Sequence, residues 1–558
     1  MRHSLSVIAI SSLWAAAACS DGGTGVKLPP CASSFGSHVG TTLGSDTMLD
    51  PASDSGCVVF DNNPSGIDSA IYLVVPQSAT GVPGVTTSFS LHGDTVRPVL
   101  AAAAVASTPR LTLAQQFHDF LRVSEQRRWF GSAPAGPGPA AVAPFPVPPD
   151  TLNQQRGFSV CSNLTCSVFK HITATAKAVD STLVIYVDNA APAGGLSSFD
   201  LDTLGKTFDN RLYAIDTAAF GRESDIDGNG KVIVLMTPIV NKLVTKKQCN
   251  DAGGGFVAGF FFGADIDPFY TSDSRFNHAE VFYSLVADPD SVLSCAHTVS
   301  EIKHVVPVTF IHEFQHMISY NQHVLLKSGD PEVLWLNEGF SHYAEELGGR
   351  SYLPTDSVTF TRFVIGDLYN AYQYLDSTGN HFLLPTEGIG SLAERGAAWL
   401  FVRYLVDQQR ADTSFAAGAA VTRPMEFTTS TGADNVAATT GVPFEQTVTN
   451  WALANYVSDL QGFTAPSQLK YTSWSFRTAF ASLHTQYPGD FIKQFPLTPG
   501  MSAGSATNVT GTLRAGSGVY RLVVQLASGP GFTLRFGTSS GGPLSATPVP
   551  RLSVIKIQ

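Results

Sequence analysis

Strand-type and helix-type hydrophobic patterns occur in separate parts of the chain. Between residues 31 and 93, short β-type runs such as "GCVVF", "AIYLVV" and "TTSFSL" are separated by Gly, Pro, Asn and Ser, which predicts a small β-sandwich. The segment 111–130, "LTLAQQFHDFLRVSEQRRWF", carries apolar residues at helical spacing with a polar opposite face, and it predicts a helix. Alternating strands and Gly turns return after about residue 500, which predicts a second β-module at the C-terminus over 495–558.

The central part of the chain mixes both periodicities. "STLVIYVD" (181–188) and "KVIVLMTP" (231–238) predict buried strands, whereas 390–410 and 443–460 predict helices. The segment 131–150 holds seven prolines and predicts an extended linker behind the first helix. We therefore expect a multidomain α+β protein. An N-terminal β-module (31–110) leads through a helix and Pro-rich linker (111–150) to a large central domain (151–470), and the C-terminal β-module follows.

Composition narrows the class of protein. The chain has 558 residues, which is too long for one hydrophobic core, and 44% of them are apolar, as in globular proteins. The formal net charge is −11, which gives no basic surface for nucleic acid, so we expect no nucleic-acid partner. The chain interior has no apolar run of the length that a membrane-spanning helix needs.

The N-terminus has the layout of an export signal. "MRHSLSVIAISSLWAAAACSDGG" places an early Arg and an apolar stretch before small residues and Cys19, which predicts a signal peptide over 1–18 and a tether over 19–30. A cysteine at this point is similar to a bacterial lipoprotein signal, with Cys19 as the lipidated residue. We expect export from a bacterial cell, with a lipid anchor at the outer membrane or cell surface, or otherwise secretion. Membrane contact is expected only through Cys19.

The cysteines fit an oxidising compartment. Removal of Cys19 from the seven leaves six, an even number that can pair. Sequence proximity favours Cys31–Cys57, Cys161–Cys166 and Cys249–Cys295, and free thiols are the alternative. No CxxC pair or Cys/His cluster indicates a cysteine metal site.

The segment "FIHEFQHMISY" (310–320) carries the first candidate chemistry. Its apolar flanks predict a largely buried helix, with Pro307 expected in its first turn. His312 and His316 then lie one turn apart on one face and can present two imidazoles to one zinc ion. Glu313 is rotated by about 100° from His312, within reach of a water but not placed as a ligand.

A second segment supplies the third ligand that such a site needs. "VLWLNEGFSHYAEEL" (333–347) also predicts a buried helix, and Glu338 follows His316 by 22 residues. Glu338, His342 and Glu345 share one face of this helix at i, i+4 and i+7. A solvated charged face is the alternative, and the apolar residues around these three positions argue against it.

The two segments together resemble the gluzincin metallopeptidases, and most resemble the hyicolysin family of neutral zinc metallopeptidases. The resemblance implies a zincin-like catalytic domain, with a mixed-sheet lobe and a mostly helical lobe, which binds one Zn²⁺ through His312, His316 and Glu338. It also implies that Glu313 activates a zinc-bound water to hydrolyse a protein or peptide substrate. This chain has His342 where thermolysin-like members have an Asp, so Glu345 is the alternative residue to orient a ligand histidine. Candidates to stabilise the oxyanion are His342, Tyr343, Tyr372, Tyr374, His381 and Tyr404.

A second metal is suggested by "DIDGNGK" (225–231). Asp225, Asp227 and Asn229 match positions 1, 3 and 5 of a calcium loop, with Gly230 at position 6. Position 12, where a bidentate Glu is expected, is Met236, so a Gly-rich turn without Ca²⁺ is the favoured alternative.

Two functions from different classes remain at this stage. The first is an exported zinc metallopeptidase; it lacks the amine-binding motif of the aminopeptidase branch, which favours an endopeptidase. The second is a surface binding or adhesion lipoprotein with a catalytically inactive metallopeptidase-like domain. The helix 111–130 and its linker are expected to form a connector or, alternatively, a propeptide. The sequence does not define the oligomeric state.

Overall fold

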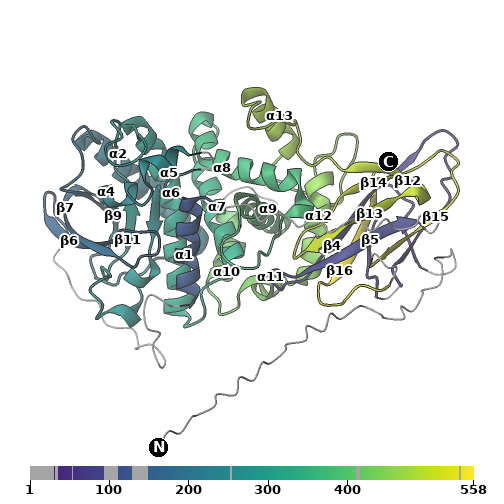
Figure 1. The fold of residues 1–558 in the computed structure, drawn as a ribbon, viewed down its shortest axis with the longest axis horizontal. Coiled ribbons are helices and arrows are strands. Elements are labelled where there is room, and N and C mark those ends of the chain that lie inside the picture. Colours follow the sequence, from purple (N-terminus) through teal and green to yellow (C-terminus); the bar gives the residue numbers. More distant parts are fainter. Residues whose placement is uncertain are drawn as a thin grey trace, which may run out of the picture.

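A computed structural model describes residues 31, 36–52, 55–93, 111–127, 149–251, 254–409, 415–538 and 542–558, with backbone alone for 415–417. The predicted signal peptide, Cys19, the tether and most of the Pro-rich linker lie outside the described residues. Within the described ranges, no helix combines the length and the hydropathy needed to cross a membrane. The multidomain α+β class is confirmed, with a sheet lobe, a helical lobe and a β-sandwich arranged along the long axis (Figure 1).

One mixed sheet of six strands forms the sheet lobe. Its order is β10 (Gly259–Phe261), β11 (Val281–Ser284), β9 (Val232–Met236), β8 (Leu183–Asp188), β7 (Phe169–Val179) and β6 (Gln155–Cys161). β11, β9 and β8 run parallel, whereas β10, β7 and β6 join antiparallel. The two predicted strands are β8 and β9, whose nearly continuous apolar runs suit the centre of a sheet covered on both faces. β10 is left as an edge strand.

Helix α6 (Val299–Ser319) packs on this sheet and carries both histidines of the first motif. It begins at Val299, so Pro307 lies inside the helix and not in its first turn, where the sequence places it. The reason is a capping box at the true start, where the Thr298 side chain accepts from the Glu301 amide and the Glu301 side chain reaches back to the Thr298 amide. The chain continues as a π-helical segment over Tyr320–Leu326.

The helical lobe is built around α7 (Leu334–Arg350), α8 (Ser357–Asp376) and α9 (Leu392–Gln409). Gly396 of α9 lets the backbones of α8 and α9 approach closely, because a Cβ there would lie 2.2 Å from the Asn370 carbonyl carbon. α9 and α12 (Phe444–Val457) confirm the helices predicted over 390–410 and 443–460. The helical lobe also contains α10 (Phe415–Glu426), α11 (Gly432–Thr440), α12 and α13 (Phe476–Gln486). Helices α2 (Ser198–Thr207) and α3 (Tyr213–Phe220) belong to the sheet lobe.

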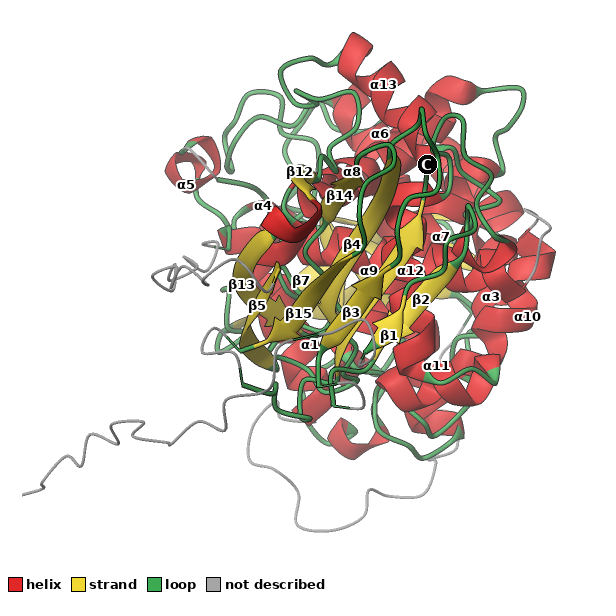
Figure 2. Ribbon diagram, turned by 90° about the vertical axis from the view of Figure 1, so that its right-hand side faces the viewer, coloured by secondary structure: helices red, strands yellow, loops and turns green. Residues whose placement is uncertain are grey.

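The two ends of the chain build one β-sandwich together (Figure 2). One sheet has the order β1 (Ser37–His38), β3 (Cys57–Phe60), β15 (Phe532–Gly537), β5 (Thr86–Gly93) and β13 (Asn508–Arg514). The other has the order β12 (Gly500–Ala503), β14 (Arg521–Gln525), β4 (Ala70–Ser78), β16 (Pro550–Lys556) and β2 (Asp46–Leu49). The prediction of two separate β-modules is therefore corrected. Strands from the N-terminal segment lie between strands from the C-terminal segment, and the apolar core between the sheets needs both.

The predicted disulfides are all present, as Cys31–Cys57, Cys161–Cys166 and Cys249–Cys295. The predicted helix near residue 111 is also present, as α1 (Leu113–Arg127). It does not lie beside the strands that precede it in sequence. It lies between the sheet lobe and the helical lobe (Figure 1), with the buried Phe117 ring 5.0 Å from the ring of Phe260 in β10.

Candidate metal centre

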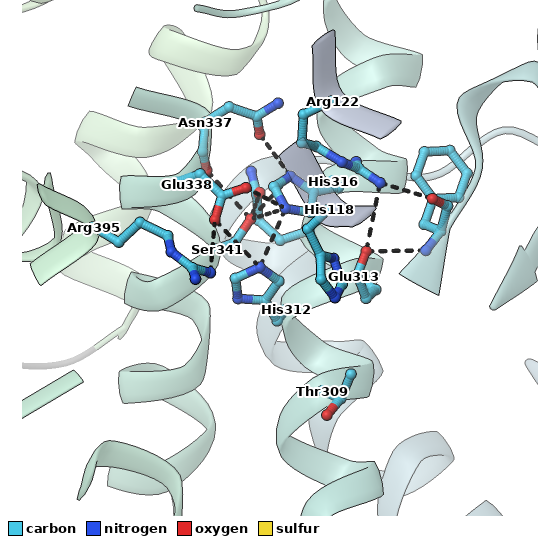
Figure 3. A network of polar contacts seen from close by, with 12 residues as sticks. His118, Arg122, Thr309, His312, Glu313, His316, Asn337, Glu338, Ser341 and Arg395 are labelled. Atoms are coloured by element: carbon cyan, nitrogen blue, oxygen red, sulfur yellow. Dashed lines mark hydrogen bonds and ion pairs between the residues drawn. The ribbon is translucent and has the colours of Figure 1, made fainter. Parts of the chain in front are cut away.

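α6 and α7 bring His312, His316 and Glu338 together in the interior of the protein (Figure 3). The Nε2 atoms of the two histidines are 3.2 Å apart, and the Glu338 carboxylate lies 3.8 Å from His312 Nε2 and 3.5 Å from His316 Nε2. Ligand atoms bound tetrahedrally to zinc at about 2.0 Å are roughly 3.3 Å from one another. The three side chains therefore have the spacing that a single zinc ion requires.

A further observation supports this fit. Glu338 is 2% exposed, and its Oε2 has no hydrogen-bond partner among the described residues. Burial by itself raises the pKa of Glu338, but His316, His312 and Arg395 together hold it well below the usual value. The Glu338 carboxylate is ionised and buried, has one oxygen without a hydrogen bond, and faces two imidazole nitrogens. Together these three groups are a chemically suitable donor set for a divalent cation.

Each histidine is oriented by a partner on α7. His312 Nδ1 lies 2.7 Å from Glu345 Oε1, and His316 Nδ1 lies 2.9 Å from Asn337 Oδ1. These contacts engage the Nδ1 atoms and leave both Nε2 atoms facing Glu338. The structure thus places Glu345 where the sequence argument expected a residue that orients a ligand histidine. Asn337, which directly precedes Glu338, is not among the residues that the sequence predicts for the site.

His342 belongs to a neighbouring polar cluster. Its Nδ1 lies 3.0 Å from Glu345 Oε1 and 2.8 Å from Asp367 Oδ1, a residue of α8 that sequence reasoning missed. Burial lowers the pKa of His342, but the carboxylates of Glu345 and Asp367 raise it to about 10. His312, His342 and Glu345 also lie close enough to form a metal-sized group. A protonated imidazole cannot bind a metal ion, so the set of His312, His316 and Glu338 fits a cation better than the set that contains His342.

Glu313 lies beside the candidate metal centre and is 1% exposed. Its Oε2 accepts a hydrogen bond of 3.0 Å from the backbone N–H of Phe261 at the edge strand. Burial raises the pKa of Glu313, but the Arg122 guanidinium, 3.6 Å from Oε2, and the imidazoles of His118, His316 and His312 together outweigh this effect, so the net pKa lies below the usual value. Glu313 is therefore an ionised carboxylate next to the centre, held by Phe261, Arg122 and His118, and it is not among the three grouped ligands.

Helix α1 contributes side chains to this environment that sequence reasoning did not identify. His118 Nδ1 is 3.5 Å from Glu313 Oε1, and burial lowers the pKa of His118 to about 4, so its imidazole is neutral. Arg122 donates to the Phe261 carbonyl at 2.7 Å and pairs with Glu125 at 2.9 Å. The amphipathic pattern of α1 predicts that one face is buried, but it carries no information on which surface covers it.

The other residues proposed from sequence lie elsewhere. Tyr343 stacks under the Arg403 guanidinium, which is 5.1 Å from its ring centroid. The candidates for oxyanion stabilisation further along the chain have these partners: Tyr372 with the Lys493 amide, Tyr374 with Ser517, His381 with Ser377 and Tyr404 with the Gln468 carbonyl. The structure instead brings Arg395 to the centre, with Nη1 3.8 Å from Glu338 Oε2.

Comparison with known proteins gives a partial match. No family model matches the chain. A stretch of 145 residues, 26% of the chain, is 30% identical to the neutral metalloprotease ShpI of Staphylococcus hyicus, and the match spans 30% of the length of that protein. The His/Glu cluster and this partial likeness support at most a metalloprotease-type class, with a site compatible with a metal ion.

Proposed function

We propose that this chain is a zinc-dependent metallopeptidase that hydrolyses peptide bonds. The observation that carries the proposal is the convergence of His312 Nε2, His316 Nε2 and the Glu338 carboxylate, with the ionised Glu313 beside them. Two imidazoles and one carboxylate are the ligand set of zinc peptidases, in which the fourth position is kept for water. Support also comes from the partial likeness to a neutral metalloprotease.

In this proposal His312, His316 and Glu338 hold the zinc ion. When bound, zinc supplies the Lewis acidity that makes water nucleophilic near neutral pH and polarises the substrate carbonyl. Glu313 accepts the proton of the attacking water at its carboxylate and returns it to the leaving amine. Glu345 and Asn337 keep the two imidazoles in the orientation that ligation needs.

The proposal includes an extracellular protein or peptide substrate, cleaved within the chain. The three disulfides support export, because such bonds persist in oxidising compartments. The predicted signal peptide and the lipid anchor at Cys19 belong to the same proposal.

One observation favours the rival function, an inactive binding lipoprotein. In the structure α1 covers the candidate centre, and Glu313, His316 and Glu338 are each no more than 2% exposed. Because His118 and Arg122 of α1 lie against Glu313, a polypeptide substrate has to displace α1 before it reaches this carboxylate.

The test takes this coverage into account. Fluorogenic peptides are offered to the zinc-loaded full chain and to a chain with Phe117→Ala and Leu121→Ala, which weaken the docking of α1, each with and without Glu313→Gln. We expect zinc-dependent hydrolysis that Glu313→Gln reduces by at least about 10²-fold, because the proton acceptor is lost. Zinc bound without hydrolysis in any of the four proteins would favour the inactive binding protein.

A further inference from the structure

The loop of residues 225–231 is folded as a calcium loop is folded. Asp225 Oδ1 accepts from the Gly230 amide at 3.0 Å, Asp227 Oδ1 from the Asn229 amide at 3.2 Å, and Asn229 Oδ1 from the Lys231 amide at 2.6 Å. Position 12 of the loop, Met236, is buried in β9 and cannot supply the bidentate carboxylate that such loops use. Loop geometry alone does not make a site.

Glu280 supplies the carboxylate that the loop lacks at its twelfth position. It precedes β11, the strand that pairs with β9, and one of its carboxylate oxygens lies within 4.8 Å of those of Asp225 and Asp227. Glu280 is 1% exposed, its Oε1 accepts from Ser224 Oγ and the Ile226 amide, and its Oε2 is buried without a hydrogen-bond partner among the described residues. A buried, unsatisfied carboxylate oxygen is costly unless a proton or a cation joins it.

The side chains at and around this loop carry a net negative charge. Arg156 donates to Asp227 Oδ2 at 3.2 Å, and Asn229 Nδ2 donates to Asp150 Oδ2 at 3.1 Å. The carboxylates of Asp225, Asp227, Glu280 and Asp150 are thus accompanied by the guanidinium of Arg156, which pairs with Asp227. A hard divalent cation with oxygen ligands suits this set better than zinc, which prefers nitrogen and sulfur.

We propose that Asp225, Asp227, Asn229 and Glu280 form a Ca²⁺ site that is separate from the candidate zinc centre. Glu280 takes the place of the twelfth loop residue from a neighbouring strand. The cation ties the loop to β11. It also braces the chain next to α6, because Asn321 and Gln322 both donate to the Arg222 carbonyl just before the loop.

The test is calorimetric titration of CaCl₂ into the zinc-loaded full chain in chelator-treated buffer. We expect one site per chain with a Kd between about 10⁻⁵ and 10⁻³ M, weakened at least about tenfold by Glu280→Gln and by Asp225→Asn. Asp225 is exposed, so its variant keeps the fold even if Glu280→Gln does not. Glu332→Gln is the matched control, since Glu332 is equally buried but both its oxygens accept hydrogen bonds. No Ca²⁺ binding by the wild type, or equal binding by Asp225→Asn and wild type, would overturn the site.

A second and independent inference concerns α1. This helix contacts both lobes across the candidate centre: Arg122 and Glu125 bind the backbone of Phe261 and Gly263 beside the sheet edge, and Asp119 accepts from the Ile389 amide of the helical lobe at 2.8 Å. The buried Phe117 and Leu121 anchor it. Arg122 and His118 also face Glu313 directly.

Resting on the proposed function, we infer that α1 is an internal inhibitory segment that occupies the substrate approach. Edge strands bind extended peptides through their free main-chain groups, and here the N–H and carbonyl of Phe261 are taken by Glu313 and Arg122. Substrate therefore has to displace α1 from the edge strand and from Glu313.

Two readouts separate this inference from the proposed function. In the Phe117→Ala, Leu121→Ala chain we expect peptide hydrolysis to rise at least about tenfold and zinc transfer to a chromogenic chelator to become faster. Gln116→Ala on the exposed face of α1 is the control and changes neither. Faster zinc transfer without any hydrolysis shows that α1 covers the metal centre, but it refutes the peptidase and with it the inhibitory role of α1. Hydrolysis that falls in the double variant, or two unchanged readouts, overturns the inhibitory segment.

Discussion

The contact between Glu345 and His312 predicts a measurable loss of zinc affinity when its charge is removed. Glu345 Oε1 lies 2.7 Å from His312 Nδ1, and the Glu345 side chain is 11% exposed. Glu345→Gln keeps the shape and an acceptor oxygen but removes the negative charge behind the ligand. Glu345→Ala removes the acceptor as well, so His312 also loses its orientation.

The expected size of the effect follows from the role of this partner. Loss of a carboxylate that orients a metal-bound histidine costs about 10- to 100-fold in metal affinity, which corresponds to about 1.4–2.8 kcal/mol. We place Glu345→Gln at the lower end of this range, because the amide oxygen still accepts from Nδ1–H. We place Glu345→Ala at the upper end. The difference between the two variants measures orientation apart from charge.

The assay is competition for Zn²⁺ between the apo chain and a chromogenic chelator of known affinity, at constant pH and ionic strength. Glu301→Gln serves as the control, since Glu301 lies at the exposed start of the same helix and is expected to leave zinc affinity unchanged. Circular dichroism verifies that each variant is folded. If Glu345→Ala binds zinc as tightly as the wild type, the assignment of His312 as a ligand held by Glu345 is refuted.

Three further predictions follow from other parts of the structure. Gly396→Ala should lower the free energy of unfolding by about 1–3 kcal/mol in a urea titration, because the added Cβ would lie 2.2 Å from the Asn370 carbonyl carbon. An unchanged midpoint contradicts the close packing of α9 on α8. Replacement of Cys249 and Cys295 by Ser opens a loop with a sequence separation of 46 residues and should cost about 4 kcal/mol in the chain-entropy model, whereas an equal melting temperature argues against that disulfide. Burial raises the pKa of Glu280 from 4.5 to about 7, so the calcium-free chain should lose stability as the pH rises from about 4.5 through 7. At pH 8 Glu280→Gln should then be more stable than wild type by up to about 3 kcal/mol, and a less stable variant in thermal unfolding would contradict this sign.

Local patterns were sufficient to predict the elements that carry the candidate centre. The spacing of His312 and His316 requires only one helical turn, and the apolar flanks of both segments indicate buried helices whose polar residues must face each other. The strands β8 and β9 were predicted for a similar reason, since their apolar runs are short and bounded by turns. Disulfide pairing by proximity was correct because each pair closes a comparatively short loop.

What could not be predicted depends on contacts between residues distant in sequence. A strand pattern shows that β4 pairs with neighbours but not that those neighbours, β14 and β16, come from the other end of the chain. The same limitation applies to Asp367 beside His342, to Glu280 beside the calcium-type loop, and to α1 against Glu313. Each of these residues is unremarkable within its own segment and gains its role only from the surface that it meets.

The most direct test of the central claim is the zinc content per chain, measured by mass spectrometry after zinc loading and removal of free metal. The account predicts about one zinc ion in the wild type and in Glu313→Gln, and loss of that ion in His316→Ala and Glu338→Ala. A wild-type chain without zinc, or a Glu338→Ala chain that retains it as firmly as the wild type, would contradict the metal centre proposed for His312, His316 and Glu338.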